Sequence, residues 1–405
     1  MNRNSTAKFV HFELGKFFFL QLYRSLRKHT GAYLKRYGFR EVLRHFSYKQ
    51  GLPPGISRQM VASFLCHNRA GKLVAAQFCH VSSWKNAGCY RLRLKSRSCG
   101  TFKVIFKNAR YSKTDIPALI GLPVLPGLAE YFFFSQKDCP ATGFLPAIYH
   151  AEEISPKEHY RYLMQDLSID HRRFAGMGDL IRICKFLPRL QESLRQSLTR
   201  TSDQPLFRYD REFDTQLLTY AYCSLKAFQS ANRDLVLNQL ITHWDEFATG
   251  YLQSSELAYS LQPLTVIHGD CNPSNLMIHR RDNSIRVFDL EWSAWGLPHS
   301  DLVSVLINAP SKMEEPCLAA FYKSLNRHTS TVDEDMAVLR HARMQRAILN
   351  ASFLAKQYLG LEGRAPSGFP RFISMACQSA WDNFNLSSIR ASALLSRTCR
   401  DRRRG

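Results

Sequence analysis

The 405-residue sequence lacks several features that would assign it to a familiar class. None of its eleven cysteines forms a CxxC pair and their number is odd, which argues against a disulfide framework or a zinc site and favours a reducing cytosol. No apolar run reaches the length of about 20 residues that spans a bilayer. Internal repeats and low-complexity segments are also missing. The composition, with 45% hydrophobic and 22% charged residues, is that of a globular protein.

Acidic residues are scarce at both ends of the chain. The net charge is +22; residues 1–50 carry eleven Lys and Arg against two acids, and the tail from Arg390 carries six Arg and one Asp. Such charge favours an anionic partner, which includes nucleic acid, an acidic membrane surface and a phosphorylated ligand. A basic but solvated surface is an equally good interpretation. Because no known nucleic-acid-binding module is visible, nucleic acid is not the expected partner.

The N-terminus has an apolar patch that Glu13 and Lys16 interrupt. No clear small-residue cleavage site follows it, so a signal peptide is not expected. An amphipathic basic helix fits better, and such a helix either packs on the protein body or lies on a membrane surface. The expected location is the cytoplasm, with peripheral contact to an anionic membrane as the alternative.

Hydrophobic periodicity divides the chain into a β-rich part and a helical part. Residues 6–50 read as helical, and the breaker cluster "GLPPGIS" at 51–57 ends that region. Strands are predicted at 72–81, 89–96, 101–109, 144–153 and 159–168, with a helix at 127–136 between them. Helices are predicted at 176–200, 211–257, 313–325 and 333–360. The expected division is an N-terminal extension over 1–55, a β-rich lobe over 56–165, a helical lobe over 166–385 and a basic tail over 386–405.

The stretch "VIHGDCNPSNLMIHRRDNSIRVFDLEWSAWG", residues 266–296, carries the chemistry. It reads as a strand, a loop, a second strand, a hairpin turn at 280–284 and a third strand. Asp270 and Asn275 lie on the loop, and Asp289 ends the third strand beside it. Two carboxylates and a carboxamide at one place repel one another unless a cation lies between them. Oxygen ligands of this kind favour Mg²⁺ or Mn²⁺, with further ligands from phosphate, and one carboxylate can stay off the metal to orient a hydroxyl.

The spacing H-G-D-x-x-x-x-N, followed fourteen residues later by D-x-E-W, resembles the aminoglycoside phosphotransferase/choline kinase-like family of small-molecule kinases. The resemblance implies an α+β, bilobal protein-kinase-like fold, with a small antiparallel β lobe and a larger, mostly helical lobe. It implies ATP and Mg²⁺ as cofactors. It also implies roles for residues in "HGDCNPSN" and "VFDLEWSAWGLPHSDL": Asp270 as the catalytic base, His268 as a brace of the loop, Asn275 and Asp289 as metal ligands, Glu291 as a second-metal ligand or an ordering residue, and Asp301 as a structural support.

A kinase also needs a strand lysine for the nucleotide phosphates and a helix glutamate to orient it. Lys103 and Lys107 lie on one face of the predicted strand 101–109, and Lys107 is favoured because "VIFK" resembles the usual apolar run that ends in Lys. The partner would be Glu130, the only acid of the predicted helix 127–136.

Two further segments would complete a nucleotide site. "YLMQDLS" resembles the adenine-binding hinge of these kinases, with contributions from Met164, Gln165 and Leu167 and with Asp166 as a helix cap. A G-x-G-x-x-G loop is absent. In its place the predicted loop 82–89 offers Ser82 and Ser83 as phosphate contacts, as Ser/Asn-rich loops do in this family.

The acceptor is not encoded in these motifs. The resemblance implies a hydroxyl of a small molecule, such as a sugar, an amino alcohol, an aminoglycoside or a lipid-linked saccharide. Trp292 and Trp295 flank the metal segment and are candidates for the acceptor site, although core packing is their more common role. The positive charge argues mildly against a polycationic antibiotic. The alternative function is a catalytically idle, kinase-like protein that binds nucleotide or a partner.

Overall fold

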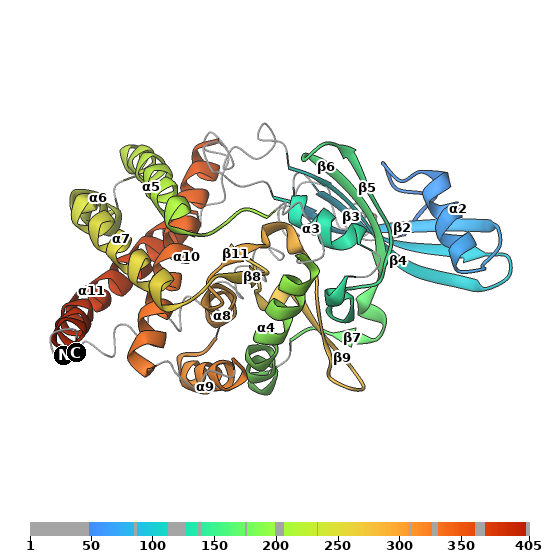
Figure 1. Cartoon of the computed structure of the whole chain (residues 1–405). Coiled ribbons are helices and arrows are strands. Elements are labelled where there is room, and N and C mark those ends of the chain that lie inside the picture. The colour runs from blue at the N-terminus through green and yellow to red at the C-terminus, as the bar shows by residue number, and fades with distance from the viewer. Residues whose placement is uncertain are drawn as a thin grey trace.

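An antiparallel six-stranded sheet forms the first part of the protein in the computed structural model (Figure 1). The structure describes residues 48–401 except 85–86, 112–125, 137–138, 175, 199–205, 233, 308, 326–330 and 361–368. The strand order is β1-β2-β3-β4-β6-β5. The strands are β1 (Lys49–Gln50), β2 (Leu73–Trp84), β3 (Ala87–Ser96), β4 (Gly100–Arg110), β5 (Ile148–Ser155) and β6 (His159–Gln165). All five strands predicted for this part are confirmed.

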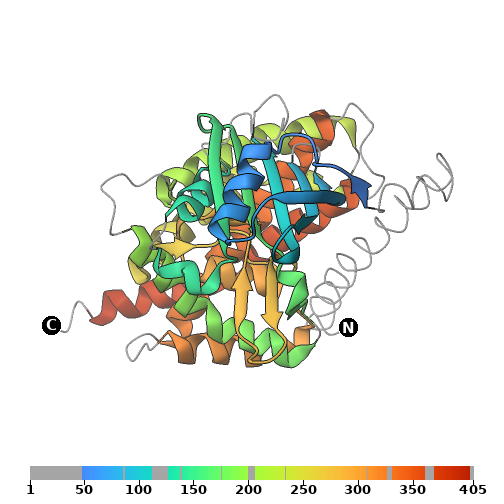
Figure 2. The same ribbon diagram turned by 90° about the vertical axis from the view of Figure 1, so that its right-hand side faces the viewer.

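Period-two alternation lets the sheet bury both of its faces. Leu92, Leu94 and Phe106 point to one face, where they pack with α2 (Arg58–His67). Tyr160 and Tyr162 point to the other face, where they pack with α3 (Leu128–Ser135) and with the helical part of the chain. Figure 2 shows α2 in blue across the outer side of the sheet. Lys107 shares the inner face, so the sheet aims it at the helical part.

The second part of the chain is mostly helical. Its helices are α4 (Met177–Leu198), α5 (Arg211–Ala231), α6 (Leu235–Thr242), α7 (Trp244–Leu261), α8 (His299–Leu306), α9 (Glu314–Ser324), α10 (Val332–Gly360) and α11 (Phe369–Asp401). α10 packs against α5, α7, α8 and α11 and therefore forms the centre of this part. The expected α+β arrangement, a β-rich part followed by a helical part, is confirmed (Figure 1).

Two small sheets lie between the six-stranded sheet and the helices (Figure 1). One has the order β10-β9-β7 and the other pairs β11 with β8. Their strands are β7 (His171–Arg172), β8 (Thr265–Ile267), β9 (Leu276–His279), β10 (Ile285–Val287) and β11 (Ala294–Gly296). β9 and β10 form the predicted hairpin. These sheets carry the stretch 266–296.

Several predicted boundaries differ from the structure. Lys49 and Gln50, placed in a helix by the sequence, form strand β1 against β2, and residues 1–47 lie outside the described residues. The predicted helix 211–257 is divided into α5, α6 and α7. Asp234 caps α6 by accepting a hydrogen bond from the Leu237 N–H at 3.0 Å, and a second break at His243 separates α6 from α7. α2 and α11 were not predicted as helices, and α11 runs across the expected boundary at 385. No helix within the described ranges has the length and apolar character needed to cross a bilayer.

Candidate active site

The loop between β8 and β9 has a backbone that only glycine allows at its second position. Gly269 has φ +79°, and a Cβ at this residue would lie 1.9 Å from the carbonyl oxygen of Trp292. The loop therefore passes directly against the segment that follows Asp289. A side chain at residue 269 would push these two segments apart.

Asp301, at the start of α8, stabilises this loop through hydrogen bonds to its backbone. Its carboxylate accepts hydrogen bonds from the N–H groups of His268 and Gly269, both at 3.0 Å, and from the Gln191 side chain at 3.0 Å. The His268 ring joins the two halves of the site, because its Nε2 lies 3.0 Å from the Phe288 carbonyl and its Nδ1 accepts the Asp270 N–H at 3.3 Å. Both side chains are buried and bond to backbone, which is the geometry of loop supports.

Asp270 has partners on both carboxylate oxygens. Oδ2 accepts the amide groups of Asn272 at 3.0 Å and Asn275 at 3.1 Å. Oδ1 accepts from Arg346 of α10 at 2.5 Å, and the same guanidinium donates to the Gly269 carbonyl at 2.7 Å. Arg346 lies 76 residues after Asp270 and belongs to no motif, so its contact with Asp270 could not be predicted from the sequence.

Lys107 lies at the centre of the site. Its ammonium is 2.8 Å from Glu130 Oε2, 2.6 Å from Asp289 Oδ1 and 3.9 Å from Glu291 Oε2. Lys103, the alternative, is exposed. Burial lowers the pKa of Lys107, but the charges of Asp289 and Glu130 outweigh it and raise that pKa well above its usual value. The side chain therefore stays cationic at any physiological pH.

The two close carboxylates of Glu130 and Asp289 around one ammonium leave an excess of negative charge. Asp289 has a left-handed backbone, with φ 68°, that turns its side chain toward Lys107, and this side chain is 35% exposed. Burial raises the pKa of Glu130 despite its bond to Lys107. A hard divalent cation beside Asp289 would offset the excess, and the oxygen donors present fit such an ion.

The described residues contain no group of three or more His, Cys, Asp or Glu side chains that could hold a metal by themselves. The predicted ligand set does not require such a group, since it combines the carboxylate of Asp289 with the carboxamide of Asn275 and with phosphate oxygens. The Asn275 Nδ2 is used by Asp270, with 3.0 Å to its carbonyl and 3.1 Å to Oδ2. Its Oδ1 accepts a long hydrogen bond from the Ser274 hydroxyl at 3.5 Å and keeps one acceptor position for a cation.

Glu291 links the two parts of the protein. Its Oε2 accepts the Tyr111 hydroxyl at 2.7 Å, and its carbonyl accepts the N–H of Gly127 at 3.1 Å. Burial and the charge of Asp289 raise the pKa of Glu291 to about 8, while Lys107 opposes this rise. The contacts favour an ordering role over the second-metal role that the sequence left open.

The predicted hinge joins β6 to a 3-10 helix, η3 (Leu167–Ile169). Met164 packs in the core, and the Gln165 N–H donates to the Ala147 carbonyl at 2.8 Å. Asp166 caps η3 by accepting the Ser168 N–H at 3.1 Å, as predicted, and also pairs with Arg91 of β3 at 2.6 Å. Arg91 thus ties the sheet to the hinge, which the sequence did not reveal.

The prediction that Ser82 and Ser83 lie in a loop is wrong. Both belong to β2, where they pair with Cys89 and Gly88 of β3. The strands extend further than predicted because pairing resumes after an irregularity between His80 and Ser82 and continues to Trp84 and Ala87.

The two tryptophans of the predicted acceptor site lie in different places. Trp292 packs beside Phe353 of α10, with ring centroids 6.0 Å apart. Trp295 lies in β11, where its ring is 6.0 Å from the guanidinium carbon of Arg208. Because Trp292 also contacts Gly269 through its carbonyl, it is the one that the fold brings to the catalytic loop.

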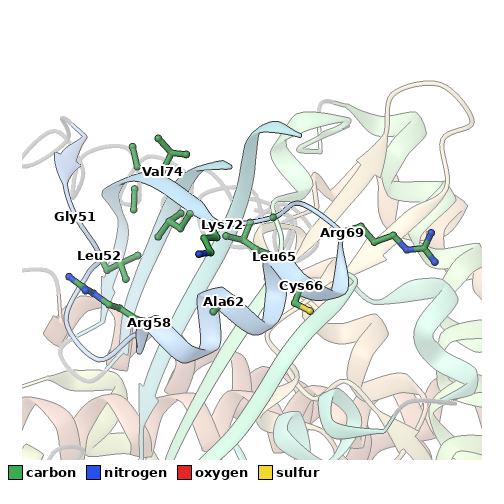
Figure 3. Close-up of a pocket in the computed structure, with 13 residues that line it drawn as sticks. Gly51, Leu52, Arg58, Ala62, Leu65, Cys66, Arg69, Lys72 and Val74 are labelled. Atoms are coloured by element: carbon green, nitrogen blue, oxygen red, sulfur yellow. The ribbon is translucent and has the colours of Figure 1, made fainter. Parts of the chain in front are cut away.

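A hollow of about 940 Å³ lies between α2 and the edge of β2 (Figure 3). Leu65 and Ala62 of α2 line it together with Lys72, Arg58 and Arg69. α2 covers the outer face of the sheet, whereas Lys107 lies on the inner face. This hollow is therefore separate from the candidate active site.

Comparison with known proteins agrees with this geometry. Residues 154–340 match the sequence model of the phosphotransferase enzyme family. No curated protein matches the chain. Among solved structures, a choline kinase from Cryptosporidium parvum is 11% identical, with 84% of this chain and 97% of that chain covered and a TM-score of 0.50.

Other solved structures show weaker likeness. A choline kinase from Streptococcus pneumoniae is 10% identical over 80% of this chain and 98% of its own, with a TM-score of 0.48. A spectinomycin phosphotransferase in complex with ADP and spectinomycin is 12% identical over 81% and 99%, with a TM-score of 0.45. The expected resemblance is confirmed: the chain has the bilobal α+β fold of small-molecule kinases and matches the phosphotransferase enzyme family over residues 154–340.

Proposed function

We propose that the protein transfers the γ-phosphate of ATP to a hydroxyl group of a small molecule. The observation that carries the proposal is the convergence of Lys107, Glu130 and Asp289 next to the loop of Asp270. These groups come from the sheet, from α3 and from the segment after β10, so the fold assembles them from three distant parts of the sequence. The match to a phosphotransferase family supports the same reaction.

In this proposal each group has a separate task. Lys107 contacts the nucleotide phosphates and Glu130 orients it, while Met164, Gln165 and Leu167 lie beside the adenine. Asn275 and Asp289 would hold Mg²⁺, which when bound neutralises charge on the phosphates.

Asp270 acts on the acceptor. Its carboxylate orients the hydroxyl, whose oxygen bonds to the γ-phosphorus as the bond to the ADP oxygen breaks, and it takes the hydroxyl proton. His268 and Asp301 fix the loop that carries Asp270. Serines 82 and 83 remain candidates for contact with phosphate through the β2–β3 hairpin.

The acceptor classes implied by the resemblance are sugars, amino alcohols, aminoglycosides and lipid-linked saccharides. Trp292 and Trp295 are proposed contacts of the acceptor. We also propose that the basic N-terminal extension, over residues 1–55, either packs on the protein or contacts an anionic membrane surface, and that the protein acts in the cytoplasm. The proposed extents of the lobes, 56–165 and 166–385, follow the change from strands to helices, whereas the proposed tail, 386–405, begins within α11.

Replacement of Asp270 tests the reaction. Purified protein with Mg²⁺ and ATP is expected to release ADP in the presence of an acceptor, in a coupled screen across sugars, amino alcohols, aminoglycosides and saccharides of lipid cores. Asp270→Ala is expected to abolish acceptor-dependent release while ATP binding persists, because Asp270 lies on the acceptor side of the site. Activity retained in this variant would contradict the assignment.

A catalytically idle, nucleotide-binding protein is the second candidate. One observation favours it, namely that Arg346 already bonds the carboxylate that would act on the hydroxyl. This candidate predicts ATP binding without ADP release for every acceptor, with Asp270→Ala indistinguishable from the wild type.

A further inference from the structure

The carboxylate of Asp270 has one position left for an acceptor hydroxyl. Each carboxylate oxygen offers about two acceptor positions. Those of Oδ2 are filled by the amide groups of Asn272 and Asn275, at 3.0 and 3.1 Å. Arg346 takes one position of Oδ1, at 2.5 Å. A hydroxyl that approaches Asp270 therefore binds to Oδ1, directly beside the guanidinium.

The Arg346 guanidinium can bind more than its present partners. It has five N–H donors, and within the described part of the chain its hydrogen bonds are those to the Gly269 carbonyl and to Asp270. Its side chain is 21% exposed and that of Asp270 is 27% exposed, so both open to solvent at the same place. A ligand at Asp270 thus also meets Arg346.

The chemistry of this position selects among acceptors. A guanidinium binds carboxylate and phosphate groups through two parallel hydrogen bonds, and it repels an ammonium. An amine next to the reacting hydroxyl would lie against Arg346 with only the already paired Asp270 to offset its charge. An anionic group at the same place would complete a chain of alternating charges: Asp270, Arg346 and the acceptor.

We propose that the acceptor is a polyol that carries a carboxylate or phosphate close to the reacting hydroxyl, and that Arg346 binds this anionic group. The proposal rests on the proposed phosphotransferase function and names the class of its acceptor. Arg346 is then the residue that separates this site from one suited to cationic amino alcohols.

Paired ligands test the proposal without knowledge of the natural acceptor. Glycerate and glycerol form one pair, glucuronate and glucose a second, and choline serves as the cation. Each is titrated by calorimetry into protein that is saturated with Mg²⁺ and a non-hydrolysable ATP analogue. The wild type is expected to bind the anionic member of each pair at least about tenfold more tightly than the neutral member. A ratio of this size is the contribution of one hydrogen bond to a charged group.

Two variants of Arg346 and a matched control test whether Arg346 causes the preference for anionic ligands. Arg346→Gln is expected to remove it, and Arg346→Lys to retain part of it because the charge remains without the planar fork. Arg343→Gln is the control, since Arg343 lies on the same helix but pairs with Glu314 at 2.7 Å. It is expected to bind both pairs as the wild type does.

Several results would overturn the proposal. One is equal or tighter binding of the neutral ligands or choline by the wild type. Another is an equal loss of affinity for both members of a pair in Arg346→Gln. This result would make Arg346 only a positioning residue for Asp270. A loss of affinity for the ATP analogue instead would assign the guanidinium to the donor phosphates.

Failure of the proposed function is distinguishable from these results. One outcome is that the protein prefers anionic ligands through Arg346 while none of the ligands causes release of ADP from ATP. This result contradicts the phosphotransferase function and leaves the anion site in place. Turnover of neutral or cationic acceptors with no anion preference confirms the function and overturns the inference alone.

Discussion

Among the residues that the structure describes, Lys107 is the one cation in contact with Glu130 and Asp289, and this determines what its removal does. Its ammonium pairs with Glu130, whose side chain is 1% exposed, and with Asp289, which is partly open to solvent. Without the ammonium, Glu130 would be a buried charge with no counter-ion. The residue therefore contributes both to folding and to the proposed binding of phosphate.

Lys107→Met is expected to destabilise the protein by about 3–5 kcal/mol and to weaken ATP binding, since it leaves Glu130 unpaired. Urea unfolding and nucleotide titration measure the two effects. The double variant Lys107→Met/Glu130→Gln is expected to regain most of the stability and none of the ATP affinity. Lys103→Met, at an exposed position on the same strand, is the control. Equal loss of ATP affinity in Lys103→Met would contradict the choice of Lys107.

At the scale of elements, the catalytic loop depends on a close approach between two segments. Gly269 lies against the Trp292 carbonyl, and Asp301 accepts the N–H groups of His268 and Gly269. The loop thus has its position fixed by backbone contacts on two sides. Side-chain chemistry at Asp270 follows from that position.

Gly269→Ala is expected to lower acceptor-dependent turnover by about 10²-fold, because the added Cβ would displace the loop and a shift of about 1 Å is enough for such a loss. ADP-release kinetics measure the effect. Gly178→Ala is the matched control: Gly178 lies in α4, where an added Cβ meets no atom within 4 Å. Wild-type turnover in Gly269→Ala would show that the loop tolerates the shift.

The sequence predicted the elements whose signals are local. Alternation in β3 and the turn between β9 and β10 each lie within about ten residues, so pattern and turn chemistry were enough. The roles expected of Asp289 and Lys107 followed from a family resemblance, and the contact between their side chains was not predicted. The helix predicted at 211–257 is divided at two places, at the cap Asp234 and at His243, and its unbroken apolar periodicity conceals both.

Arg346 shows the limit of reasoning from sequence. Its contact with Asp270 depends on the packing of α10 against α8 and on the direction of one side chain. Neither is encoded within a window of neighbouring residues. The contact between Arg346 and Asp270 was therefore accessible only from the structure.

At the scale of the whole molecule, one buried acid ties three helices of the helical part together. Asp214 of α5 is fully buried and accepts hydrogen bonds from Tyr251 at 2.8 Å and Ser255 at 2.6 Å, both in α7. It also accepts from Gln345 at 2.8 Å and pairs with His341 at 3.0 Å, both in α10. Gln345 precedes Arg346, so this network supports the turn of α10 that reaches the catalytic loop.

The charge of Asp214 makes stability depend on pH in one direction. Burial raises the pKa of Asp214, but the charge of His341 and the hydrogen bonds outweigh burial and lower it below the usual value of 3.8. The unfolded chain therefore binds a proton at a higher pH than the folded protein does. The stabilisation is fully present above about pH 4 and is lost as the pH falls through the folded-state pKa.

Asp214→Asn keeps the shape of the side chain and removes the charge. We expect it to lower the free energy of unfolding at pH 7 by about 1–3 kcal/mol, since the amide N–H₂ group of Asn cannot accept all the hydrogen bonds that Tyr251, Ser255 and Gln345 donate to the carboxylate. Urea unfolding at a series of pH values measures this cost and is expected to show that it shrinks below pH 4, where protonation weakens the wild type but not the variant. Asp245→Asn, on the first turn of α7 and outside this network, is the control. A cost in Asp214→Asn that stays constant down to pH 2 would show that hydrogen bonding alone, without charge, joins α5, α7 and α10.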